Sequence, residues 1–304
     1  MSIRKGISAV LLLALVISLP TGKSVSQNAD TPYFGRYDKL KLDQFPKSHA
    51  GAGSIILTEL VGSRHMKTPL LWIHRGVIPP HCGIGAHYQA GMEDMFFAFN
   101  QPAEFTINGH TSLLPAGSMV PCPLESWHGI YNNSDTPLEW MNIGVSIVKD
   151  KYKVIDLADS LTDRRCETPP EFLWNNFDRS LMKPVTKVHQ GKGELLFRRV
   201  LNTKHFKTNI EFLDHLILPP DTSIGYHQHT KGEEIYYIMH GKGRMTVNDK
   251  TWDVCKGDAI PCPFNGSHGI YNNSGKELEI FVLAISMNKG EFDAVDKGDD
   301  LSKR

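Results

Sequence analysis

The sequence has no excess of charge of either sign, because its 33 lysine and arginine residues equal its 33 aspartate and glutamate residues. Proteins that bind nucleic acid or membrane surfaces electrostatically need a basic excess, and this composition offers none. We therefore expect a small-molecule substrate as the partner, and no nucleic acid. With 304 residues, 40% hydrophobic and 22% charged, the chain is long enough for two globular domains with ordinary cores.

Cysteine is scarce, and its number is odd. The five residues are Cys82, Cys122, Cys166, Cys255 and Cys262. In an exported protein they could form disulfides, but an odd number leaves at least one thiol free or paired with another molecule. No pairing can be assigned from their spacing.

The apolar run over residues 7–19 is shorter than the roughly 20 residues that a membrane-spanning helix needs. Two basic residues precede the run, Pro20 ends it, and SVS at residues 24–26 offers a small-x-small cleavage site. This pattern predicts a secretory signal peptide over residues 1–26. We therefore expect a periplasmic or secreted protein that has no membrane attachment after cleavage.

Most of the chain is an internal repeat. HAGAGSIILTELVGSRHMKT from His49 aligns with HQGKGELLFRRVLNTKHFKT from His189, and HGIYNNS occurs from both His128 and His268. The offset, 189 − 49 = 140 residues, is too long for a solenoid unit and indicates a duplicated domain. Apolar or alternating strands separated by Gly, Pro and Asn turns predict that each copy is a small antiparallel β-barrel.

The repeat divides the chain into two predicted barrels with connecting segments. We expect a signal peptide at 1–26, an N-terminal arm at 27–48, barrel 1 at 49–149, a linker at 150–188, barrel 2 at 189–289 and a charged, loosely held tail at 290–304. Within the linker, LADSLTDRR is typical of a short helix, and ETPPEF of a proline-broken connection. The predicted fold class is all-β, with two tandem barrels and a short helical linker.

A histidine-rich stretch in the second copy, GYHQHTKGEEIYYIMHG over residues 225–241, carries the clearest chemistry. His227 and His229 are two residues apart, so in an extended strand they face the same way. Glu234 opens the predicted return strand, and His268 follows in a later loop. Three neutral imidazoles and one carboxylate suit a divalent metal such as Fe, Mn, Ni, Cu or Zn.

These residues resemble the two motifs of the cupin superfamily. The first motif corresponds to His227, His229, Glu234 and Gly241, and the second to Gly257, Pro263, His268 and Asn272. Asp221 and Asn265 stand where glycine is usual, but neither is a ligand position. The resemblance implies double-stranded β-helix (jelly-roll) barrels, a bicupin with one divalent transition metal in barrel 2, and a possible homodimer.

The first copy departs from this ligand set. The corresponding residues are His87, Gln89, Asp94 and His128. An amide oxygen is a poor ligand for these metals, and aspartate is one carbon shorter than glutamate, so we predict a degraded metal site. A weaker or differently loaded site that uses His87, Asp94 and His128 is the alternative, because two histidines and one carboxylate suffice for some Fe(II) enzymes.

Several residues near the motif strands could assist a reaction. Tyr226, Tyr236 and His215 could hydrogen-bond a substrate or act as acid or base, and as an alternative they pack the barrel. Glu233 is a further carboxylate, but strand alternation turns it away from Glu234. We therefore expect Glu233 to be solvated or to act outside the ligand set.

The predicted site is compatible with several reactions, because cupins host oxidation, decarboxylation, isomerisation, lyase and hydrolytic chemistry as well as binding. We favour an exported, Fe- or Mn-dependent enzyme of the dioxygenase type that acts on a small polar organic substrate in barrel 2. One alternative is a Zn or Ni lyase, isomerase, decarboxylase or hydrolase. Another is a non-catalytic periplasmic binding protein. In either case barrel 1 could be a stabilising or dimerising partner.

Overall fold

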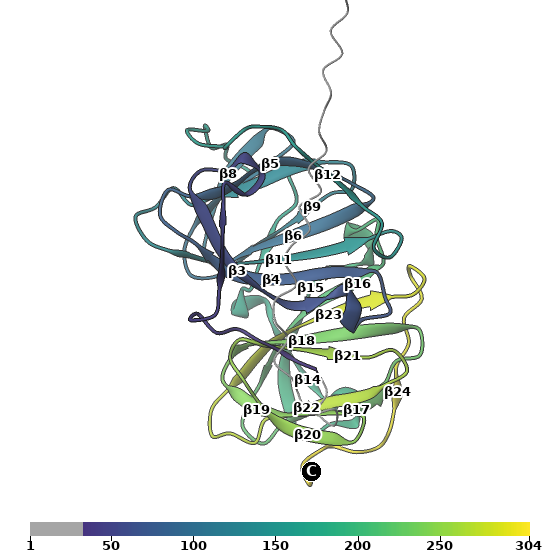
Figure 1. The fold of residues 1–304 in the computed structure, drawn as a ribbon. Coiled ribbons are helices and arrows are strands. Elements are labelled where there is room, and N and C mark those ends of the chain that lie inside the picture. The colour runs from purple at the N-terminus through teal and green to yellow at the C-terminus, as the bar shows by residue number, and fades with distance from the viewer. Residues whose placement is uncertain (1–32) are drawn as a thin grey trace, which may run out of the picture.

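The computed structural model describes residues 33–304, and the predicted signal peptide lies outside the described residues. The described part forms two β-barrels stacked on each other, barrel 1 above barrel 2 in Figure 1. The prediction of an all-β chain with two tandem jelly-roll barrels is confirmed. No helix within residues 33–304 has the length and apolar character needed to cross a membrane.

Barrel 1 consists of a seven-stranded and a five-stranded antiparallel sheet. The larger sheet has the order β13 (Asn175–Asn176), β9 (Ser118–Cys122), β6 (Met92–Ala98), β11 (Leu138–Ser146), β4 (Leu70–Ile78), β3 (Ser54–Gly62) and β2 (Asp43–Pro46). The smaller sheet has the order β12 (Lys153–Asp156), β5 (Gly83–Ala90), β10 (Trp127–Tyr131), β7 (Ala103–Ile107) and β8 (His110–Leu114).

Barrel 2 repeats this arrangement. Its larger sheet has the order β1 (Gly35–Arg36), β21 (Asp258–Cys262), β18 (Gly232–His240), β23 (Leu278–Ser286), β16 (Ile210–Leu218), β15 (Glu194–Asn202) and β14 (Lys183–Thr186). Its smaller sheet has the order β20 (Lys250–Cys255), β19 (Lys242–Val247), β22 (Ser267–Tyr271), β17 (Ser223–Gln228) and β24 (Val295–Asp296).

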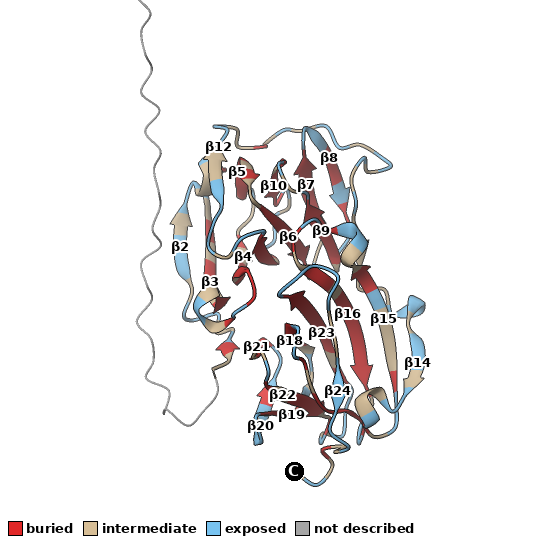
Figure 2. Cartoon of the chain, turned by 90° about the vertical axis from the view of Figure 1, so that its right-hand side faces the viewer, coloured by how far each residue is buried: buried red, intermediate tan, exposed pale blue. Residues whose placement is uncertain are grey.

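The two larger sheets pack face to face, which explains why their central strands are apolar on both sides. In β23, Ile280 and Val282 face the core of barrel 2, whereas Phe281 and Leu283 belong to a shared cluster between the barrels. In β11, Met141 lies in the same shared cluster. Every residue of β23 except Glu279 is buried, and Figure 2 colours most of this strand red. A sheet covered on both faces needs continuous hydrophobic runs rather than alternation.

The barrels exchange short strands. β1 comes from the N-terminal arm but pairs with β21 of barrel 2, and Arg36 forms a two-bond ion pair with Asp258 at 2.7 and 2.8 Å. β13, which lies 140 residues after β1 (175 − 35), comes from the linker and pairs with β9 of barrel 1. The structural repeat therefore extends beyond the two predicted barrel ranges.

The predicted short helix over LADSLTDRR in the linker is not formed. Residues 157–165 contain bends and a turn, and Ala158, Leu161 and Asp163 have positive φ angles. Leu161 is 1% exposed and packs over Gly129, while the Asp159 carboxylate accepts a hydrogen bond from the Leu161 amide at 2.9 Å. Burial of the leucine and this local bond outweigh helix propensity. A helical turn that lies wholly within the linker is the 3₁₀ segment η3 (Arg179–Leu181).

The prediction of a loosely held tail is wrong. Strand β24 pairs with β17, and Leu301 is 1% exposed beside Gly269. Arg304 binds Asp299 and Asp249 at 2.7 and 2.9 Å. The charges of the tail therefore pair locally while one leucine anchors it, as Leu161 anchors the matching segment of barrel 1.

Candidate metal centre

Four side chains converge inside barrel 2, and we call them the second-barrel cluster. His227 lies on β17, His229 just after it, Glu234 on β18 and His268 on β22. One donor atom of each lies within 4.8 Å of the others, and all four residues are buried. The antiparallel pairing places His227 directly opposite His268, and alternation along β17 turns His227 inward. The structure thus brings together every ligand that the sequence predicted for barrel 2.

Backbone carbonyls orient two of the imidazoles. Nδ1 of His227 lies 2.8 Å from the Gly225 carbonyl oxygen, and Nδ1 of His229 bonds the Asp293 carbonyl oxygen. A carbonyl only accepts, so both Nδ1 atoms carry the hydrogen, and both Nε2 atoms are left to face the cluster. Burial would lower the pKa of His229, but Glu234 raises it above its usual value, so a metal would displace a proton from this Nε2. Each of these Nε2 atoms is buried without a hydrogen-bond partner. Such orphaned nitrogens facing one point fit a metal ion.

The protonation states also suit a metal. Burial alone would raise the pKa of Glu234, but the imidazoles of His229, His227 and His268 hold this pKa well below its usual value. Burial, reinforced by His227, lowers the pKa of His268 to about 3. Oε2 of Glu234 lies 3.0 Å from Nε2 of His268. The cluster therefore offers an ionised carboxylate and a neutral imidazole near pH 7, as metal binding requires.

A further histidine supports the cluster from outside. The His189 ring stacks on His227 with the centroids 3.7 Å apart, and its Nδ1 lies 2.8 Å from Asp296 on β24. In barrel 1, His49 stacks on His87 at 4.0 Å and bonds Asp156. The sequence shows these histidines only as repeat-matched positions; their stacking depends on the fold.

A buried aspartate on the inner face of barrel 2 pairs with a half-exposed arginine, and neither residue was predicted from the sequence. Arg199 of β15 donates to both carboxylate oxygens of Asp214 on β16, at 2.8 and 2.9 Å. Its guanidinium lies over the Phe212 ring at 4.1 Å. Its side chain is 46% exposed, against 8% for Asp214. Leu195, which packs in the barrel core, lies on the same face of β15 by alternation. That shared face is the signal that could have identified Arg199.

The strand register connects this pair to the cluster. Residues that pair across β16, β23 and β18 form rows on the sheet. One row consists of Asp214, Val282 and Tyr236. The next row on the same face consists of Phe212, Ala284 and Glu234. Asp214 and Glu234 therefore lie in adjacent rows on the inner face of one sheet. Phe292 from the tail extends this wall, with its ring 4.5 Å from His229.

The pH dependence of stability is expected to report on Asp214. Burial raises its pKa to about 6, although Arg199 lowers it. The folded state then holds this proton more tightly than the unfolded chain, so ionisation of Asp214 reduces the free energy of unfolding as pH rises from about 4 to about 6. Relative to wild type, Asp214→Asn should gain stability across this window, by at most about 3 kcal/mol, and then remain level. Urea denaturation of the metal-free proteins at several pH values measures this. Parallel pH curves would contradict it.

The three predicted catalytic residues occupy different places. Tyr236 lies in the interior, 1% exposed, with its ring 5.6 Å from His268, and burial raises its pKa well above the usual value. Tyr226 faces the opposite side of β17, where its hydroxyl accepts from the Asp249 amide at 2.9 Å. His215 faces barrel 1, with Nε2 2.8 Å from the Glu279 carboxylate. The structure brings Tyr236 to the cluster, and not Tyr226 or His215.

Barrel 1 contains a corresponding first-barrel cluster, made of His87, Gln89, Asp94 and His128. Donor atoms of the two histidines and the aspartate lie within 4.8 Å of one another. The Gln89 amide donates to Asp94 Oδ2 at 2.8 Å, so it engages the carboxylate that a metal would need. In place of Arg199 and Asp214 this barrel has Glu59 and His74. The degraded site stays a prediction, because three candidate ligands still converge.

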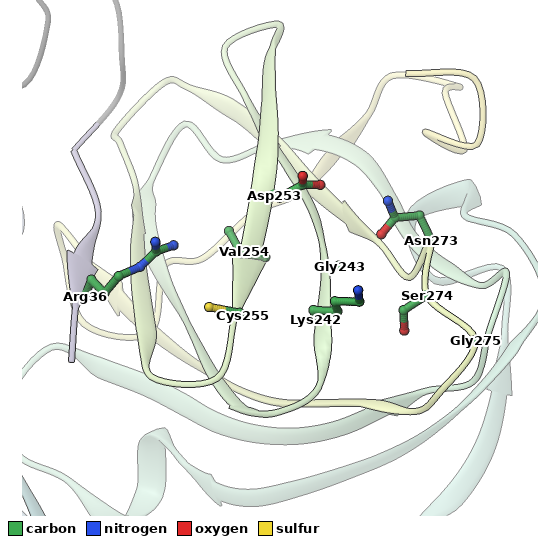
Figure 3. A pocket seen from close by; sticks show the side chains of 9 residues that line it. All are labelled: Arg36, Lys242, Gly243, Asp253, Val254, Cys255, Asn273, Ser274 and Gly275. Atoms are coloured by element: carbon green, nitrogen blue, oxygen red, sulfur yellow. The ribbon is translucent and has the colours of Figure 1, made fainter. Parts of the chain in front are cut away.

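A surface hollow of about 510 Å³ lies elsewhere on barrel 2 (Figure 3). It is lined by Arg36, Lys242, Gly243, Asp253, Val254, Cys255, Asn273, Ser274 and Gly275. No member of the second-barrel cluster lines it. Arg36 is already paired with Asp258, so we assign this hollow no part in the site.

Two kinds of sequence comparison agree with this geometry. A family model for the cupin domain matches residues 214–285, which contain the whole second-barrel cluster. An oxalate-binding protein of Thermotoga maritima is 30% identical over 101 residues, covering 33% of this chain and 84% of that protein. An uncharacterized protein of Methanocaldococcus jannaschii is 34% identical over 93 residues, covering 31% of this chain and 74% of that protein.

Solved structures with two barrels are also similar. Salicylate 1,2-dioxygenase from Pseudoaminobacter salicylatoxidans in complex with gentisate has a TM-score of 0.60 and 14% identity, covering 80% of this chain and 78% of that one. Oxalate decarboxylase of Bacillus subtilis has a TM-score of 0.60 and 14% identity, covering 88% and 80%. At these identities the likeness shows the fold alone.

Proposed function

The chain belongs to the cupin superfamily and has the two barrels of a bicupin, and on this premise we propose that it is a metal-dependent enzyme acting on a small carboxylate in barrel 2. The observation that carries the proposal is the second-barrel cluster, with two orphaned imidazole nitrogens and an ionised carboxylate, next to Arg199.

The metal proposed is one Fe or Mn ion per chain, held by the second-barrel cluster. Its mixed imidazole and carboxylate donors accept either metal, and Zn, Ni or Cu are the alternatives. The structurally similar oxalate decarboxylase of Bacillus subtilis has Mn(II) centres. When bound, Fe or Mn would supply the redox chemistry of a dioxygenase or decarboxylase, and Zn or Ni would supply Lewis acidity.

The substrate class is proposed from Arg199. A guanidinium presents two parallel N–H donors that match a carboxylate, and Asp214 occupies this position in the free protein. Oxalate, salicylate and gentisate, named for the similar proteins, all contain a carboxylate. We propose that a substrate carboxylate takes the place of Asp214 on the fork of Arg199, whose side chain is 46% exposed.

The other inward-facing side chains would act around a substrate held in this way. Tyr236 stays protonated because burial raises its pKa, so its hydroxyl would donate a hydrogen bond. Arg199 lowers the pKa of Asp214, which is about 6 in this pairing, so Asp214 would take up and hold a proton once it separates from Arg199. The rings of Phe212 and Phe292, 5.4 Å apart, would exclude water.

Within this proposal we favour a dioxygenase, with a decarboxylase as the alternative reaction. A non-catalytic binding protein is a second candidate, favoured by the 30% identity to the oxalate-binding protein. The test is incubation of Fe- or Mn-loaded protein with oxalate, salicylate or gentisate, with both O₂ uptake and CO₂ release recorded. With salicylate or gentisate, O₂ consumption that matches substrate loss without CO₂ release would support the dioxygenase. CO₂ release without matching O₂ consumption would favour the decarboxylase, and ligand-induced thermal stabilisation without turnover would favour the binding protein.

We also propose that the protein is exported to the periplasm or the medium and forms a homodimer. The basis for export is the signal-peptide pattern of residues 1–26, and the basis for the dimer is the family resemblance. N-terminal sequencing of the mature protein and its sedimentation behaviour test the two parts separately.

A further inference from the structure

Glu233 is buried between the two barrels, although it immediately precedes a predicted metal ligand. It is 1% exposed and lies on the outer face of β18. Its Oε2 accepts hydrogen bonds from the backbone amides of Lys67 and Thr68 in barrel 1, at 2.8 and 2.7 Å. Its Oε1 accepts one from the Phe264 amide in barrel 2, at 2.9 Å. Three backbone donors thus satisfy this buried carboxylate.

The Phe264 contact matters because of where this residue lies. It belongs to the loop between β21 and β22, directly before the strand that carries His268. In the same loop, the Asn265 amide donates to the His229 carbonyl at 3.1 Å. Glu233 therefore ties the strand of Glu234 to the loop that presents His268. It also ties both to barrel 1, where the Lys67 ammonium lies 5.3 Å from the Phe264 ring.

A nearly symmetric contact exists in the other direction. Glu93, which precedes Asp94 in barrel 1, accepts from the Lys207 and Thr208 amides of barrel 2, at 2.9 and 2.7 Å. It also accepts from the Thr208 hydroxyl at 2.7 Å. Within residues 33–304, the bonds of Glu93 reach this turn and not the loop before its own histidine strand. Both glutamates therefore join the two barrels. Of the two, Glu233 also bonds the loop that precedes the histidine-bearing strand of its own barrel.

We propose that Glu233 is a positioning residue for the second-barrel cluster, and that barrel 1 holds this cluster in its metal-binding geometry through the Lys67–Thr68 turn. The inference rests on the metal-binding part of the proposed function. Outer contacts that orient metal ligands typically change metal affinity by about 10- to 100-fold. A turn of barrel 1 is therefore part of the metal centre of barrel 2, whether or not barrel 1 binds metal itself.

The test compares Glu233→Gln with Glu93→Gln. In each variant an amide NH₂ replaces one acceptor oxygen and faces backbone N–H donors, so both should lower the melting temperature of the metal-free protein. Mn(II) affinity of the second-barrel cluster, measured by competition with a chelator, should fall by about 10- to 100-fold in Glu233→Gln. It should stay at the wild-type value in Glu93→Gln. This readout requires no turnover.

Two outcomes would overturn the inference alone: wild-type Mn(II) affinity in Glu233→Gln, or an equal loss in both variants, which would indicate general loosening of the interface. A wild-type protein that binds no metal would overturn the proposed function as well. If Glu233→Gln does not fold, Glu233→Asp serves under the same criteria. Its shorter side chain keeps the charge but cannot span from Phe264 to the Lys67–Thr68 turn.

Discussion

Replacing His229 with alanine is expected to remove the metal from barrel 2 and to abolish turnover. The substitution deletes one of the two imidazoles whose Nε2 atoms are buried without a partner, and it leaves Glu234 with one neighbour fewer. Since changes in outer contacts alone cost about 10- to 100-fold in metal affinity, loss of a ligand should cost more than about 100-fold. Elemental analysis of the purified variant beside wild type measures the metal content.

The matched control is His87→Ala, which makes the corresponding type of change in the first-barrel cluster. If barrel 1 is degraded, this variant keeps the metal content of wild type. Loss of one metal equivalent in each variant would show that both barrels bind metal and would contradict the degraded site. Metal retained in full by His229→Ala would contradict the proposed ligand set of barrel 2.

Replacing Arg199 with alanine should produce the second large effect, a rise in KM for the carboxylate substrate. Truncating one partner of a buried charge pair costs about 2–5 kcal/mol, and the 46% exposure of Arg199 places the expected effect at the lower end, about 10- to 100-fold. Arg199→Lys should recover only part of this loss, because an ammonium cannot form the two parallel bonds. Steady-state kinetics at saturating metal give KM and kcat separately.

Two controls make the Arg199 result interpretable. Arg198→Ala changes the preceding residue, whose side chain points the other way and bonds Asn175 and Asn176, so KM should not change. The double variant Arg199→Ala/Asp214→Asn avoids leaving a buried carboxylate without its partner. A KM that equals wild type in both Arg199→Ala and the double variant would rule out the carboxylate fork.

The predictions that held depended on local patterns. Strand alternation sets the direction of His227 and His229, and the 140-residue repeat sets the number of barrels, so both are readable without tertiary contacts. Arg199 and Asp214 could not be connected in this way, because their pairing depends on the register between β15 and β16, including a shift after Arg199. The composition of either strand alone does not determine the register between them.

Dependence on contacts distant in sequence also explains why the linker helix was wrongly predicted and why the partners of Glu233 were not predicted. LADSLTDRR has helix-forming residues, but the burial of Leu161 over Gly129 depends on a strand far away in sequence. Alternation correctly turned Glu233 away from Glu234, yet it could not show that a second barrel receives the side chain. Contacts between the barrels become predictable only once both sheets are placed face to face.

The exchange of β1 and β13 also bears on how the chain can be made. Gly35 and Arg36 are among the earliest described residues to be synthesised, but their partners Ala259 and Asp258 are completed more than two hundred residues later, with a separation of 222 for the Arg36–Asp258 bond. Contacts so distant in sequence are slow to form. Strand β1 therefore cannot pair with β21 until barrel 2 has been synthesised, whereas β13, which precedes barrel 2 in the sequence, can complete the larger sheet of barrel 1 earlier.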